Sequence, residues 1–218
     1  SPDALINLID NLRARGIERM RALHKGTPAE LERRIEAANG FFEMAKRKMH
    51  TLSPATQKKL AHNAFFNAIN LGDEKREEYF RKHGEYPPFF LLMSPSMACD
   101  LRCYGCYAWK YPKSKSLSRE KVSEIITEAK EDMGIYFISL TGGEPTYWPH
   151  LEEIVREHDD VFFQVYTHGQ RIDDAMAKRF SEYGNIYPAI SLEGDEALTD
   201  ARRGKGAYKR VMQAMDNL

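Results

Sequence analysis

All three cysteines of the chain lie close together, at Cys99, Cys103 and Cys106. This C-x3-C-x2-C spacing is a poor disulfide framework, because neighbouring thiols cannot join distant segments. It suits a metal better: three thiolates can hold three irons of a cubane iron–sulfur cluster and leave the fourth iron open to another ligand. A zinc site completed by a histidine is the alternative, but a closed zinc site normally has four protein ligands.

Four short apolar runs follow residue 85, and a polar or glycine-rich segment stands at the end of each run. The runs cover residues 89–93, 135–140, 161–166 and 186–192. The segments at their ends cover residues 94–96 (with the cysteines beyond), 141–145, 167–169 and 191–194. In parallel α/β folds, ligand-binding residues collect at the carboxyl ends of the strands. Four such ends in a row therefore predict one shared site.

The stretches between the apolar runs have helical patterns, over residues 118–133, 149–158, 173–183 and 207–218. Ser118 is expected to cap the first of these helices. Strands that are buried on both faces and separated by helices predict a parallel α/β sheet or barrel. The fold class is therefore α/β, with four βα units in residues 86–218.

The first 85 residues have a different character, since they are rich in Ala, Leu, Glu, Lys and Arg and lack β-branched runs. Helix start and stop signals recur at Thr27-Pro28, Ser53-Pro54 and Gly72-Asp73. These signals predict four or five helices. A proline pair at Pro87-Pro88 then interrupts any helix. We expect an N-terminal helical domain over residues 1–85.

The cysteine spacing, followed by Gly142-Gly143-Glu144-Pro145, resembles the signature of the radical S-adenosylmethionine (SAM) superfamily. The resemblance covers residues 86–218 and implies a partial (β/α) barrel, a [4Fe–4S] cluster on the three cysteines, and SAM at the open iron. Enzymes of this family cleave SAM with one electron, and the resulting 5′-deoxyadenosyl radical takes hydrogen from a substrate. The implied partners are SAM, an unidentified substrate, and an electron donor such as flavodoxin or ferredoxin.

The resemblance also implies SAM contacts within the glycine-rich motif. Gly142, Gly143 and Glu144 match the GGEP motif, which binds the SAM amino group. Paired glycines let backbone carbonyls approach a ligand, and Glu144 can accept a hydrogen bond from an ammonium. Thr167 begins a Thr-His-Gly segment that corresponds to Thr-Asn-Gly in relatives, with His168 in place of Asn.

Contacts to the rest of SAM are implied at three further places. Ser191 and Glu193 stand where relatives bind the ribose, and an ordinary strand-end serine beside a solvated glutamate is the alternative. The segment Arg202-Arg203-Gly204-Lys205-Gly206 resembles the Arg-x-Gly-x-Gly segment of relatives. Arg203, with Arg202 as the second candidate, is expected to bind the SAM carboxylate, and a solvated basic loop is the alternative. Relatives carry an aromatic residue before the third cysteine, where this chain has Gly105. Tyr104 or Tyr107, which stand on either side of Gly105, is expected to contact the adenine instead, and Tyr104 is the first candidate.

The overall composition excludes some classes of function. Basic and acidic residues balance at 32 each, which gives no electrostatic case for nucleic acid or an anionic membrane. No apolar stretch approaches the roughly 20 residues of a spanning helix, and no signal peptide is visible at the start. A thiolate site implies a reducing compartment, so we expect a cytoplasmic protein.

Two other functions stay open. The thiolates could serve an iron–sulfur or zinc module without SAM chemistry, although such a module has no need of the glycine-rich strand end. The chain could also be an inactive fragment of a longer enzyme, because relatives usually have six βα units and only four are visible before residue 218. A barrel with only four βα units would leave one edge of its sheet exposed.

Overall fold

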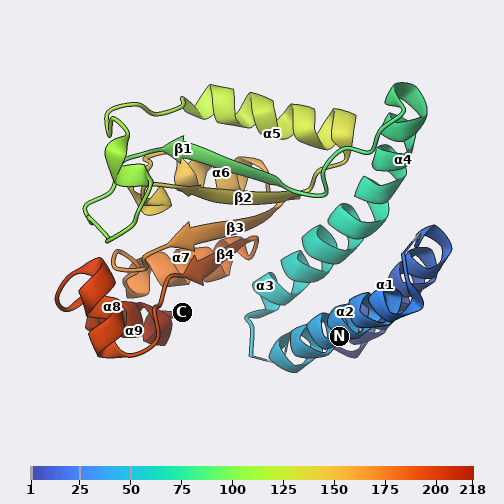
Figure 1. The fold of residues 1–218 in the computed structure, drawn as a ribbon, viewed down its shortest axis with the longest axis horizontal. Coiled ribbons are helices and arrows are strands. Elements are labelled where there is room, and N and C mark those ends of the chain that lie inside the picture. Colours follow the sequence, from blue (N-terminus) through green and yellow to red (C-terminus); the bar gives the residue numbers. More distant parts are fainter. Residues whose placement is uncertain (1, 25, 50) are drawn as a thin grey trace.

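The protein is an α/β structure with helices at its N-terminus, seen here in a computed structural model that describes residues 2–24, 26–49 and 51–218 (Figure 1). Four parallel strands form one sheet in the order β1-β2-β3-β4. They are β1 (Leu91–Ser96), β2 (Phe137–Gly142), β3 (Phe162–Thr167) and β4 (Ile186–Ile190). The predicted fold class is confirmed.

Helices follow the strands in the expected alternation. They are α5 (Arg119–Met133), α6 (Leu151–Glu157), α7 (Asp174–Tyr183), α8 (Glu196–Arg203) and α9 (Ala207–Asn217), with short helices η2 (Ala108–Lys110) and η3 (Pro145–Tyr147). Ser118 caps α5 as predicted, because its side chain accepts a hydrogen bond from the Lys121 amide. The helix α8 was not predicted.

The main hydrophobic core joins one face of the sheet to the helices. Side chains of β2 and β3 alternate between faces, and every second one is fully buried against α5 and α6. The core includes Ile138, Leu140, Phe163 and Val165 from the strands, and Val122, Ile126, Ile154 and Val155 from the helices. This packing fixes the strands, and hence the positions of the loops at their carboxyl ends.

The first strand differs from its prediction over residues 89–93. It begins at Leu91 and continues through Ser96, because Ser96 pairs with Gly142 of β2 after a shift in register. Pro95 is tolerated within it because β1 is an edge strand of the sheet, where a missing amide donor removes no necessary ladder bond. The last strand ends at Ile190, so that Ser191 begins the loop.

The N-terminal helices are α1 (Pro2–Leu23), α2 (Pro28–Met49), α3 (Pro54–Lys59), the π-helical η1 (Leu60–Leu71) and α4 (Gly72–His83). Two predicted starts are confirmed. Thr27 and Glu30 form a capping box in which the Thr27 amide donates to Glu30 Oε2 at 2.8 Å, and Ser53 accepts a hydrogen bond from the Thr56 amide. The predicted division at residue 85 stays a prediction.

The predicted helix signal at Gly72-Asp73 coincides with the change from the π-helical η1 to α4, but the helical backbone continues through Gly72 without a break. This glycine serves close packing instead. A side chain added there would lie 2.4 Å from the Gly134 carbonyl oxygen, so the helix can approach the core only with glycine at this position. Figure 1 shows the resulting α3–η1–α4 helix running between the sheet and the α1–α2 pair.

Buried polar side chains attach this long helix to the sheet at the end opposite the cysteines. Asn63 Nδ2 donates to the carbonyls of Asp159 and Val161 at 2.8 and 3.0 Å, just before β3. Arg76 donates to the Gly134 carbonyl at 2.9 Å, just before β2.

Among the described residues, no helix is both long and apolar enough to cross a membrane.

Candidate functional site

The three cysteines lie on the loop that leaves the carboxyl end of β1. Each is partly buried and has a free thiol. Within the loop the Cys106 amide donates to the Cys103 carbonyl at 3.1 Å, and the Leu101 amide lies 3.4 Å from Cys99 Sγ. The Tyr104 amide donates to the Arg202 carbonyl at 2.8 Å, which attaches the loop to the end of α8.

The loop and the other strand ends enclose one cavity of about 210 Å³. All the predicted site residues line it except Gly142, Glu193 and Tyr104: its walls include Cys99, Cys103, Cys106, Gly143, Glu144, Thr167, Ser191 and Arg203. These residues come from the ends of all four strands and from α8. The prediction that the four strand ends share one site is therefore matched by the geometry.

The glycine pair fixes the end of β2 against the start of the cysteine loop. The Gly143 amide donates to the Ser96 carbonyl at 3.0 Å, and the Glu144 amide donates to the Ala98 carbonyl at 2.8 Å. A side chain on Gly143 would lie 2.3 Å from the Ala98 oxygen, and one on Gly142 would lie 2.3 Å from the Ser96 oxygen. Both positions therefore require glycine for this close backbone contact.

The Glu144 carboxylate is buried at the centre of the site, with 1% of the residue exposed. Its Oε1 accepts hydrogen bonds from the Thr146 amide at 3.1 Å and from the Thr146 and Thr167 hydroxyls, both at 2.7 Å. Its Oε2 accepts one hydrogen bond, from the His168 amide at 2.8 Å. Since a carboxylate offers about two acceptor positions per oxygen, Oε2 retains one.

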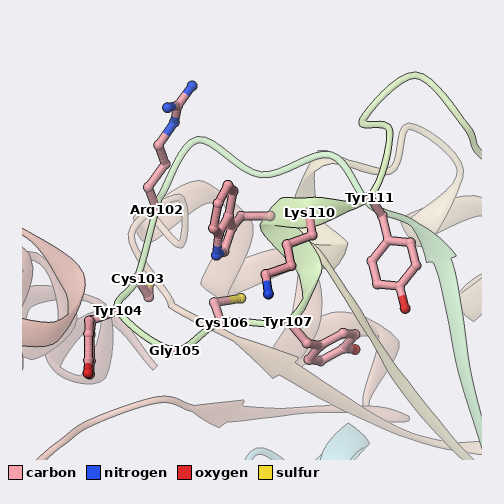
Figure 2. Close-up of a pocket in the computed structure, with 9 residues that line it drawn as sticks. Arg102, Cys103, Tyr104, Gly105, Cys106, Tyr107, Lys110 and Tyr111 are labelled. Atoms are coloured by element: carbon pink, nitrogen blue, oxygen red, sulfur yellow. The ribbon is translucent and has the colours of Figure 1, made fainter.

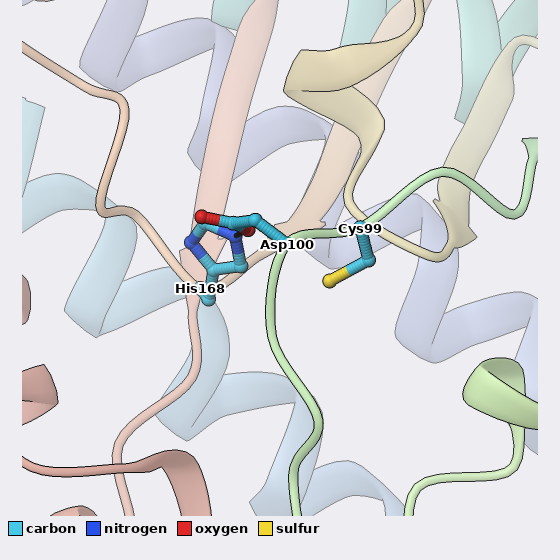
Figure 3. A group of neighbouring side chains, drawn as sticks. All are labelled: Cys99, Asp100 and His168. Carbon is cyan, nitrogen blue, oxygen red and sulfur yellow. Dashed lines mark hydrogen bonds and ion pairs between the residues drawn. The ribbon is translucent and has the colours of Figure 1, made fainter.

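A second buried side chain, His168, connects the cysteine loop to the end of β3 (Figure 3). Its Nε2 lies 3.0 Å from Asp100 Oδ1, and Asp100 directly follows Cys99. Burial opposes ionisation of Asp100, but its interactions with His168, the backbone and Tyr147 outweigh that effect and lower the pKa of Asp100. Neither Asp100 nor Tyr147 is among the residues predicted from the sequence, because no local pattern marks either one.

The two residues expected to touch the ribose and carboxylate of SAM form an ion pair with each other. Glu193 Oε1 accepts from Arg203 Nε and Nη2 at 3.1 and 2.5 Å, and Glu193 Oε2 accepts from Arg202 Nη1 at 2.7 Å. Hydrogen bonds from Arg203, then Arg202, lower the pKa of Glu193. The carboxylate thus holds Arg203 against the cavity that this arginine lines.

The predicted adenine contact, Tyr104, lies outside the cavity and is 84% exposed. It borders a larger hollow of about 690 Å³ that the cysteine loop itself forms, together with Cys103, Cys106, Tyr107 and Tyr111 (Figure 2). Tyr107 lines both the hollow and the cavity. Of the two tyrosines beside Gly105, Tyr107 is therefore the better placed to contact a ligand in the cavity.

The donor set of the loop fits an iron–sulfur cluster. Burial raises the pKa of the Cys99 and Cys103 thiols, and iron binding removes those protons because a coordinating thiol is deprotonated. Three sulfur donors on one short loop, facing a cavity with other polar groups, suit a cluster with one open iron. A closed zinc site would need a fourth ligand, and His168, the histidine on this cavity, is engaged with Asp100.

Comparison with known proteins agrees with this geometry. The profile of the radical SAM superfamily matches residues 93–218, more than half of the chain. Mycofactocin maturase MftC of Mycobacterium ulcerans is 32% identical over 143 residues, which are 63% of this chain and 38% of MftC. Fe-coproporphyrin III synthase of Methanosarcina barkeri is 32% identical over 124 residues, which are 55% of this chain and 31% of the synthase.

The fold is similar to that of Streptococcus suis SuiB, whose structures bound to SAM and to the precursor peptide SuiA each align with a TM-score of 0.56. Identity is 24% and 23%, and the alignments cover 84% of this chain and 43% and 44% of SuiB. The chain thus spans less than half the length of the relatives that it matches. With a family match over more than half of its residues, the chain belongs to the radical SAM superfamily, whose enzymes use a [4Fe–4S] cluster and SAM.

Proposed function

We propose that this protein binds a [4Fe–4S] cluster through Cys99, Cys103 and Cys106, binds SAM in the adjoining cavity, and removes hydrogen from a peptide substrate. The observation that carries the proposal is the single cavity lined by all three thiols and by residues from every strand end. When bound and reduced, the cluster supplies the electron that cleaves SAM into methionine and a 5′-deoxyadenosyl radical. Flavodoxin or ferredoxin is the proposed source of that electron.

The other residues of the cavity bind and orient SAM in this proposal. Glu144 accepts the SAM ammonium at the remaining position on Oε2, where burial strengthens a charge-assisted hydrogen bond. Arg203, held by Glu193, offers a guanidinium to the SAM carboxylate. Ser191 lines the same cavity and is available to the ribose hydroxyls. Positioning of this kind is the main contribution of a protein to cofactor chemistry.

A peptide is the proposed substrate class for two reasons. Relatives include a mycofactocin maturase and the sporulation killing factor maturation protein SkfB, and SuiB has been solved with its precursor peptide. In this chain, the loop hollow of about 690 Å³ is lined by two of the cysteines and by exposed tyrosines and a tryptophan. Tyrosine and tryptophan side chains, apolar with polar tips, are enriched at interfaces with other polypeptides, and this supports a peptide as the substrate.

The test is anaerobic iron–sulfur reconstitution, followed by assay of 5′-deoxyadenosine after addition of SAM and dithionite. We expect about four irons per chain and measurable 5′-deoxyadenosine in the wild type. Cys99→Ala, Cys103→Ala and Cys106→Ala should each abolish both, whereas Ser114→Ala, at an exposed position of the following loop, should leave both unchanged. Tight zinc without iron, or iron without 5′-deoxyadenosine, would refute the proposal for this chain.

A further inference from the structure

The ring of His168 lies between the carboxylates of Asp100 and Glu144. Its Nε2 is 3.0 Å from Asp100 Oδ1 and 3.4 Å from Glu144 Oε2. The imidazole is buried, with 4% of its side chain exposed, while the Asp100 side chain is 43% exposed. A single nitrogen therefore faces both the residue beside the first cysteine and the proposed acceptor for SAM.

Hydrogen bonding at the other ring nitrogen fixes where the proton of His168 resides. The Gln170 amide lies 3.1 Å from His168 Nδ1. A backbone amide can only donate, so Nδ1 must present its lone pair and the ring proton must be on Nε2. The Nε2–H is thus one donor with two candidate acceptors, and the shorter distance assigns it to Asp100.

The second candidate acceptor is the position that the proposed function reserves for SAM. Oε1 of Glu144 already accepts three hydrogen bonds, and Oε2 accepts one from the His168 amide. One acceptor position then remains on Oε2. If the imidazole donated there, a SAM ammonium would have to displace it.

We propose that Asp100 is a positioning residue that holds the His168 Nε2–H away from Glu144 and so keeps Glu144 Oε2 available to the SAM ammonium. The inference rests on the proposed function, in which Glu144 binds that ammonium. Asp100 and its neighbour Cys99 then have different roles. Cys99 binds iron in the proposed function, whereas Asp100 acts on SAM binding through His168.

Further contacts keep Asp100 in this position. The side chain of Tyr147 lies beside the Asp100 carboxylate. Tyr147 is itself held by Arg171, whose guanidinium carbon lies 4.2 Å from the centre of the tyrosine ring and whose Nη1 donates to the Thr146 carbonyl at 2.5 Å. Asp100 is therefore in contact with residues that follow β2 and β3, and its hydrogen bond is with His168, after β3.

The test is a double-mutant cycle on Asp100 and His168, read as the Kd for SAM from the EPR change of the reduced cluster. Asp100→Ala should raise the Kd roughly tenfold, the effect of one competing hydrogen bond to a charged acceptor. Asp100→Asn, whose side-chain oxygen still accepts, should stay within about twofold of wild type. In a His168→Ala background, Asp100→Ala should have no further effect, because the competing donor is gone.

Iron content and the EPR signal without SAM show whether the cluster is intact in every variant, and Asp132→Ala, at an exposed position of α5, is the matched control. An unchanged Kd in Asp100→Ala, or an equal loss with and without His168, would overturn the inference. A wild type that does not bind SAM would refute the proposed function and the inference together. SAM binding that Glu144→Gln abolishes but Asp100→Ala leaves intact would refute the inference alone.

Discussion

Substitution of Gly143 by alanine tests whether the glycine pair is required by backbone packing. The added Cβ would lie 2.3 Å from the Ala98 oxygen and 2.5 Å from the Met97 oxygen. Both obstacles are backbone atoms, so no side-chain rotation relieves them. The φ angle of Gly143 is not positive, so alanine can adopt the same backbone conformation without strain. The expected loss of stability therefore comes from the steric contact alone.

The size of the destabilisation depends on the backbone of Met97 and Ala98, which must move to make room for the added Cβ. Overpacking of this kind costs about 1–3 kcal/mol. Displacing the loop also weakens the bond from the Glu144 amide to the Ala98 carbonyl, worth about 1 kcal/mol. We therefore expect Gly143→Ala to lower the free energy of unfolding by about 2–4 kcal/mol. Iron content after reconstitution should also fall, because the displaced segment leads directly into Cys99.

Urea denaturation of the protein without iron measures the first effect, and iron and sulfide analysis measures the second. Gly105→Ala is the matched control within the same loop: its φ is +73° and nothing lies within 4 Å of an added Cβ. Backbone strain alone should cost it about 1–2 kcal/mol. A Gly143→Ala protein within 1 kcal/mol of wild type, with full iron content, would refute the packing argument.

Two further predictions concern stability away from the cavity. Hydrogen bonds from Arg179 lower the pKa of Glu152 below its ordinary 4.5. The ionised Glu152 therefore stabilises the fold above pH 4.5, and this stabilisation is lost as the pH falls through the lowered pKa. The melting temperatures of wild type and Glu152→Gln should converge in acid, and a constant difference from pH 7 to 3 would contradict this. Arg76→Met leaves the buried Gly134 carbonyl without its donor and should lower the free energy of unfolding in urea by about 1–3 kcal/mol. The matched substitution at an exposed position, Arg81→Met, should cost under about 0.5 kcal/mol. Equal effects would contradict this explanation.

Much of the architecture could be predicted because it depends on local patterns. Buried strands alternate with amphipathic helices, and parallel strands place their carboxyl ends along one edge. The cysteines, Glu144 and Ser191 were therefore expected together, and they line one cavity. The helix α8 was missed because it is short and its residue Leu198 is exposed, so its apolar pattern is weak; Asp195, whose side chain caps it, was the available signal.

The contacts that determine the chemistry of the site could not be predicted in the same way. Asp100 and His168 are 68 residues apart, and they are in contact only because the loops that follow β1 and β3 converge at the carboxyl ends of these strands. The ion pair of Glu193 with Arg203 depends on the unpredicted α8. Tyr104 lies on the outer side of its loop for a similar reason, since its amide is bonded to the end of α8. Such side-chain positions follow from tertiary packing, which leaves no periodic trace in the sequence.

The most direct test of the central claim is EPR spectroscopy of the reconstituted, dithionite-reduced protein with and without SAM. The claim is that the three cysteines and the strand ends form one site for a cluster with an open iron and for SAM. It predicts a [4Fe–4S]⁺ signal whose shape changes on addition of SAM, and a Glu144→Gln variant that keeps the signal but loses the change. A cluster signal that SAM does not alter would contradict the claim.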